Sequence, residues 1–234
     1  MRKFLIVAIA AFTAIAFTAT SYAQSGATMK VKVTPNKAGT KKKPKNSKIN
    51  LSVVNEDTSR TMSKLVITTS KTFKLSTKGL TKCNADTLEQ QGVSACPKAS
   101  RVGKGVAEAL VGVNGPNPTA LTFDVTAVVT GSRNIAFDLQ GRQLPVHVMA
   151  PGKISGRKLT IQVPNAAQQP VPGTYAGLVS LEATLSGRKG KNYLASTNGC
   201  TSKKHPFSST LTFIDNGVSP AGNVTAKANA ACKK

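Results

Sequence analysis

The stretch LTFDVTAVVTGSRNIAFDL, residues 121–139, decides the fold class of this chain. Apolar and polar side chains alternate through residues 121–130 and again through residues 134–139, as in strands that bury one face. Gly131, Ser132 and Arg133 separate the two runs and form a loop short enough to join antiparallel neighbours. The stretch therefore predicts a β-hairpin, the unit from which an antiparallel sheet is built.

Similar runs recur along the rest of the chain, separated by clusters of Gly, Pro, Asn and Ser. They cover residues 29–34, 49–55, 64–69, 159–163, 177–185 and 208–213. Short strands at fairly even spacing indicate a sandwich or a barrel. We predict an all-β fold, an antiparallel β-sandwich of the immunoglobulin-like or jelly-roll-like kind. Few or no helices are expected after the N-terminal segment, and only residues 85–91 favour a turn or two of helix.

The N-terminal segment predicts a cleavable signal peptide over residues 1–23. Arg2 and Lys3 precede an apolar run over residues 4–17, and small residues stand at Ser21 and Ala23, so cleavage is expected after Ala23. The run is shorter than the roughly 20 apolar residues that a membrane span needs, although an uncleaved anchor is the alternative. No later segment reaches that length. The protein is expected to be secreted or otherwise extracytoplasmic, with no transmembrane segment after processing.

The remaining residues, 24–234, suit one β-sandwich domain. A division within residues 114–118, Asn-Gly-Pro-Asn-Pro, is the alternative, because this is the one other stretch with the composition of a linker. We prefer a single domain, since five residues is an ordinary loop length.

Four cysteines, an even number in an exported chain, indicate two disulfides, although three pairings are open. The favoured pairing joins Cys83 to Cys96 and Cys200 to Cys232, because cysteines that are neighbours in sequence close short loops. A zinc site is disfavoured, since no two cysteines have the spacing of zinc ligands and His147 and His205 do not complete a set. The expectation is no metal site and no cofactor.

Net charge is the strongest chemical signal in the sequence. Lys and Arg number 32 against 9 Asp and Glu, for a net charge of +23, which becomes +21 once Arg2 and Lys3 leave with the signal peptide. Lysine is densest between the first two expected strands, in residues 36–48. The candidate binding residues are Lys41, Lys42, Lys43, Lys45 and Lys48. Such an excess attracts polyanions, and outside a cell these include anionic envelope polymers and surfaces. The alternative is a solvated turn that only keeps the protein soluble.

The motifs typical of catalysis are incomplete in this sequence. Gly103-Lys104-Gly105 lacks the further glycine of a dinucleotide fingerprint and the Ser or Thr of a P-loop, so a glycine-containing strand start or bulge is expected there. His147 is expected to face solvent from a strand, and His205 to lie in a loop. No Gly-x-Ser-x-Gly elbow is present. A non-catalytic protein is therefore the main hypothesis.

Three stretches resemble a group of exported actinobacterial proteins of uncharacterised function. They are the lysine-rich residues 37–44, Cys83 followed by Cys-Pro-x-x-Ser-x-x-Gly-x-Gly over residues 96–105, and the late Cys200 and Cys232. The resemblance implies a secreted, β-rich domain with paired cysteines, and it implies no activity.

These observations together predict a secreted or envelope-associated protein that binds anionic polymers electrostatically and has no specific nucleic-acid target. Two alternatives remain. One is a structural module that binds a protein partner through its sheet. The other is a hydrolase in which His147 or His205 lies within reach of a serine or an acid.

Overall fold

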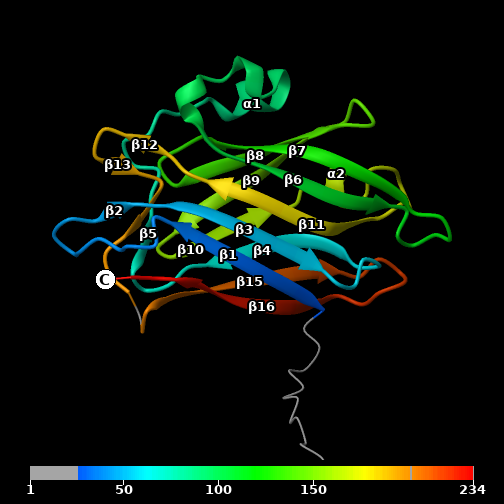
Figure 1. Cartoon of the computed structure of the whole chain (residues 1–234). Helices are drawn as coiled ribbons and strands as arrows, with labels where there is room; N and C mark the ends of the chain where they lie inside the picture. Colours follow the sequence, from blue (N-terminus) through cyan, green and yellow to red (C-terminus); the bar gives the residue numbers. More distant parts are fainter. Residues whose placement is uncertain (1–25, 201, 234) are drawn as a thin grey trace, which may run out of the picture.

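The computed structural model describes residues 26–200 and 202–233, so the predicted signal peptide with Ala23 lies outside the described residues. The predicted all-β fold with few helices is confirmed: one antiparallel sheet of eleven strands dominates the molecule (Figure 1). In the order in which they pair, its strands are β1 (Ala27–Thr34), β3 (Lys48–Asn55), β11 (Ala176–Leu185), β6 (Arg101–Val111), β7 (Thr119–Val129), β8 (Asn134–Gly141), β9 (His147–Ser155), β10 (Lys158–Gln162), β4 (Thr61–Thr68), β15 (Lys204–Ile214) and β16 (Gly222–Ala231).

This sheet curls until its two edge strands, β1 and β16, lie side by side (Figure 1). The two walls that a sandwich would build from separate sheets therefore come from one continuous sheet, which is nearly a closed cylinder. Alternate residues of the strands point inward and form one apolar core, as the alternating burial of β15 illustrates.

The hairpin predicted from residues 121–139 is present as β7 and β8. Ala127 faces Phe137 and Val129 faces Ile135 across the pair, and all four side chains are buried. Residues 114–118, where a division of the chain was considered, lie in the loop 112–118 that connects β6 to its neighbour β7. Strands from both sides of this loop belong to the same sheet.

Antiparallel pairing throughout the sheet places alternate connections at opposite ends of the cylinder. One end, here called the plugged end, contains residues 35–47, 69–100, 130–133, 156–157, 186–203 and 232–233. A small sheet of β2 (Lys45–Asn46), β14 (Ala195–Thr197) and β5 (Phe73–Leu75) lies there, beside the hairpin of β12 (Arg188–Lys189) and β13 (Asn192–Tyr193). Leu75, Leu80 and Leu194 from these connections are buried in the core and fill this end.

The other end, here called the open end, contains residues 56–60, 112–118, 142–146, 163–175 and 215–221. It carries the short helix α2 (Asn165–Gln168). Neither this helix nor any other in the described part of the chain is long and apolar enough to cross a membrane.

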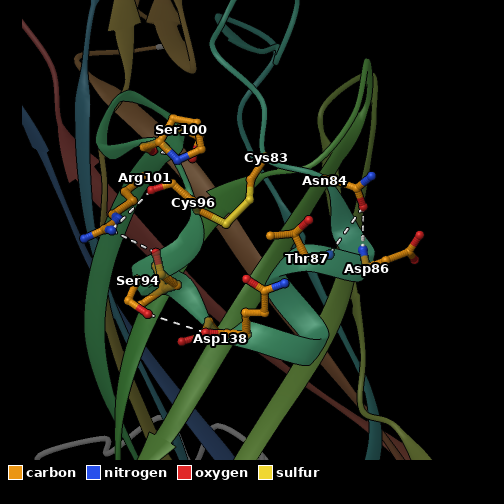
Figure 2. Close-up of a disulfide and its surroundings, with 12 residues drawn as sticks. Cys83, Asn84, Asp86, Thr87, Ser94, Cys96, Ser100, Arg101 and Asp138 are labelled. Carbon is orange, nitrogen blue, oxygen red and sulfur yellow. Dashed lines mark hydrogen bonds between the residues drawn. A yellow bond between two sulfur atoms is a disulfide. The ribbon is translucent and has the colours of Figure 1, made fainter.

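The helix predicted over residues 85–91 is confirmed as α1 (Ala85–Gln91), which packs on the outer face of the sheet (Figure 1). The Asn84 side chain caps it, because its Oδ1 accepts from the amide of Asp86 at 2.7 Å. Leu88 is fully buried against the outward-facing Val128 and Ala136. The disulfide Cys83–Cys96 joins the residues that flank α1 and the turn η1 (Val93–Ala95), and the turn η2 (Lys98–Ser100) leads into β6 (Figure 2).

Candidate basic binding surface

The predicted lysine-rich segment, residues 36–48, is an ordered turn at the plugged end. The amide of Thr40 donates to the carbonyl oxygen of Lys43 at 3.0 Å, and the amide of Lys43 donates to the Thr40 hydroxyl at 3.1 Å. Lys41, Lys42 and Lys43 form the tip of this turn, and Lys45 and Lys48 follow it. All five side chains are exposed. The backbone of the segment is thus fixed while its ammonium groups extend into solvent.

Residues from the other end of the chain lie beside this turn. Lys37 pairs with Lys233 as a parallel bridge, and the disulfide Cys200–Cys232 anchors the same C-terminal residues. The amide of Cys232 also donates to the carbonyl oxygen of Lys203 at 2.9 Å. Lysines far apart in sequence are therefore brought to one place.

The concentration of positive charge extends over the whole plugged end. Outside the helical segment 84–100, its connections contain sixteen Lys and Arg residues and no Asp or Glu. All sixteen are exposed, and we call them the basic cluster. They are Lys37, Lys41, Lys42, Lys43, Lys45, Lys71, Lys74, Lys78, Lys82, Arg133, Arg157, Arg188, Lys189, Lys191, Lys203 and Lys233.

The open end has the opposite character. Its connections contain three acids, Glu56, Asp57 and Asp215, and two arginines, Arg60 and Arg142. No member of the basic cluster forms an ion pair with any of the described residues, where Arg142–Asp124 and His147–Asp138 are the pairs present. The charge of the basic cluster is therefore uncompensated, and an anion that approaches the plugged end meets a potential to which many cations contribute.

Both predicted disulfides are formed, Cys83–Cys96 and Cys200–Cys232, with Cα–Cα distances of 5.3 and 5.8 Å. One ligand-type atom from each of Cys200, Cys232 and His205 lies within 4.8 Å of the others, an arrangement that could hold a metal ion if both sulfurs were free. The two sulfurs are bonded to each other, which leaves the imidazole as the one available donor of the three.

His205 is not a loop residue, contrary to expectation, but a fully buried member of β15. Its Nδ1 lies 3.1 Å from the Thr72 hydroxyl, and the edge-on ring of Phe73 has its centroid 4.7 Å away. Burial lowers the pKa of His205 below its ordinary value, which favours the neutral ring. These surroundings keep the imidazole out of contact with solvent, so a role inside the fold is what its position supports.

His147 is exposed at the start of β9, as expected of a solvent-facing strand histidine, and its ring is also hydrogen-bonded. Its Nε2 lies 2.6 Å from Oδ1 of Asp138, a fully buried carboxyl whose other oxygen accepts from the Gln140 amide at 3.2 Å. The pair bridges β8 and β9 diagonally, since Gln140 is the direct partner of His147. No described hydroxyl or thiol is hydrogen-bonded to His147, so the two residues lack the nucleophile of a hydrolytic triad.

The Gly103-Lys104-Gly105 motif is structural, as expected. It lies in β6, where the register with β7 shifts between Arg101 and Gly103, which is the predicted bulge. A Cβ atom at Gly105 would overlap the carbonyl oxygen of Glu182 on the adjacent strand. The glycine is therefore required by close approach of two strands and not by a phosphate.

Compared with protein-family models, with curated proteins and with solved structures, the chain shows no significant match.

Proposed function

We propose that this is an extracytoplasmic, non-catalytic protein that binds an anionic polymer of the cell envelope through the basic cluster. The observation that supports this most strongly is the gathering of sixteen exposed cations at one end, from five connections and the C-terminal residues 232–233. Outside the helical segment 84–100, these segments contain no acid. The predicted signal peptide supports a location outside the cytoplasm, where anionic envelope polymers are among the polyanions that a basic protein attracts.

The chemistry of the cluster fits a repeating anion. Thirteen of its members are lysines, whose ammonium groups act as mobile point charges and suit loose contact with successive phosphates or carboxylates. Affinity of this kind is the sum of many weak attractions, each screened over about 8 Å at physiological ionic strength. Binding is therefore expected to weaken steeply as salt is raised.

The test is retention of the purified protein on isolated cell envelopes across a salt gradient. The variant Lys41→Gln, Lys42→Gln, Lys43→Gln, Lys45→Gln removes four charges from the tip of the basic cluster. It should elute at clearly lower salt than the unchanged protein. These side chains are exposed, so the substitutions leave the core intact.

A matched control removes the same net charge elsewhere. Lys30, Lys32, Lys104 and Lys227 are exposed on strands of the main sheet and lie outside the basic cluster. Their replacement by Gln should shift elution much less. Equal shifts for the two variants would mean that overall charge, and not the basic cluster, governs attachment. Retention that does not change with salt concentration would overturn the electrostatic proposal itself.

A further inference from the structure

The half of the cylinder toward the open end is hollow. A cavity of about 440 Å³ lies there between seven strands and the segment around α2. Twenty-five of its twenty-six lining residues are apolar or glycine, and the exception is Thr119. None of these described lining residues has an ionisable side chain. Ligand pockets in proteins usually have volumes of about 300–1,000 Å³ and mainly apolar walls, so this cavity falls in their range.

The cavity exists because small side chains occupy inward-facing positions. Ala107, Ala109 and Ala150 lie on the inner face where large residues would otherwise meet across the cylinder. Protein interiors are ordinarily packed as densely as organic crystals, with few voids larger than a water molecule. A far smaller apolar cavity, of about 150 Å³, stays dry and accepts apolar molecules. The unfilled space here is therefore suited to an apolar guest.

The mouth of the cavity is also apolar. Leu144, Val146 and Val171 belong to connections of the open end and line the cavity, yet they are 49%, 37% and 57% exposed. Exposed large apolar side chains that continue into a cavity mark an entry route for an apolar ligand more often than a plain surface.

The cavity extends along β7. Four alternate residues of β7, from Thr119 to Val125, line it, and at ~3.4 Å per residue they cover a depth of about 20 Å. An apolar space of this depth accommodates an extended hydrocarbon chain that lies along its length.

We propose that the cavity binds a single linear hydrocarbon chain, such as that of a fatty acid or the acyl chain of an envelope lipid. The hydrocarbon chain of the ligand enters between Leu144 and Val171 and lies along β7, with its far end near Val125. This site goes beyond the proposed function and is independent of it, because the basic cluster lies at the other end of the cylinder.

Among the described residues, the connections of the open end offer no free cation for a head group. Arg142 is paired with Asp124 at 2.6 Å, and Arg60 lies 4.3 Å from the ring centroid of Phe213 and donates to the carbonyl oxygen of Pro220. These are the two cations in the connections of this end. The polar group of the ligand therefore stays in solvent, and recognition depends on the chain.

The test is displacement of a dansyl-labelled fatty acid from the purified, processed protein. Palmitic acid, its methyl ester and a palmitoyl lysophospholipid should all displace the probe. Equal affinity of the acid and the ester is expected, because only the chain is recognised. Displacement by the lysophospholipid alone would assign the site to envelope lipids and overturn recognition by the chain only. Failure of the probe to bind would overturn the proposal.

Two substitutions in one hairpin give a matched pair. Ala109 faces the cavity, whereas Ala120 is exposed on the outer face of the neighbouring strand. Ala109→Phe should reduce probe affinity at least tenfold, and Ala120→Phe should leave it unchanged. Equal binding by both variants would contradict the site. If Ala109→Phe does not fold, the site can be tested by NMR with a spin-labelled stearic acid bound to the unchanged protein. The label should broaden the methyl signals of Ala107 and Ala150 and leave that of Ala195 unchanged.

Discussion

The amide of Lys233 donates to the carbonyl oxygen of Asn36 at 2.7 Å, so the C-terminal residues are hydrogen-bonded to the start of the lysine-rich turn. The return bond runs from the amide of Ala38 to the carbonyl oxygen of Lys233 at 2.9 Å. Part of the basic cluster is thus built on backbone that is fixed from both ends of the chain, and the stability of this junction can be tested separately from ligand binding.

Removal of the disulfide Cys200–Cys232 should loosen that junction. The double variant Cys200→Ala, Cys232→Ala frees a loop of 32 residues, which costs about 3–4 kcal/mol of unfolding free energy in the chain-entropy model. Urea unfolding measures this loss, and faster hydrogen exchange at the Ala38 and Lys233 amides locates it. The variant Cys83→Ala, Cys96→Ala is the control: it should lose similar stability without faster exchange at Lys233.

A Cβ atom at position 105 should destabilise the sheet. Gly105→Ala forces β6 and β11 apart at the carbonyl oxygen of Glu182, at a cost of about 1–3 kcal/mol. Gly115→Ala is the control, because its Cβ atom would meet only the carbonyl oxygen of Gly112 at 3.5 Å, an ordinary contact. It should change the unfolding free energy by less than ~0.5 kcal/mol. Equal stability of the two variants would contradict the structural role of Gly105.

Acid should destabilise the fold through His205. Burial holds its pKa below the ordinary 6.5, so the unfolded chain binds this proton more readily than the folded one. Its contribution to stability is complete above about pH 6.5 and declines as the pH falls below that value. The unfolding free energy, measured at about pH 7.5 and pH 5, should therefore fall less in His205→Gln than in the unchanged protein. A steeper fall in the variant would contradict this account.

Strands with alternating, β-branched sequences could be predicted from the sequence. Strands rich in glycine, proline or alanine could not. Residues 121–139 predict β7 and β8 because every inward position is apolar. β6 contains two glycines near its start, β9 contains Pro151 and Gly152, and β16 is rich in alanine. Glycine, proline and alanine are depleted in strands, so these three became visible only through their neighbours in the sheet.

The candidate sites, too, could be predicted only in part from the sequence. The lysine-rich turn is visible in the sequence, but the basic cluster is not, because its members come together only when the strand order assigns each connection to an end. The Asp138–His147 pair likewise depends on the register of β8 with β9. The cavity could not be predicted from alternation alone. Alternation shows that Ala107, Ala109 and Ala150 face inward, but only the strand order and register show that all three line the same cavity.

Lysine acylation followed by mass spectrometry, with and without isolated envelope polymer, measures whether the basic cluster is the contact surface for that polymer. If the basic cluster is the contact surface, bound polymer should leave acylation at Lys30, Lys104 and Lys227 unchanged. It should slow acylation in the basic cluster, at Lys37, Lys41, Lys42, Lys43, Lys45, Lys203 and Lys233. Equal protection of both sets, or protection of Lys30, Lys104 and Lys227 alone, would contradict the proposed contact surface.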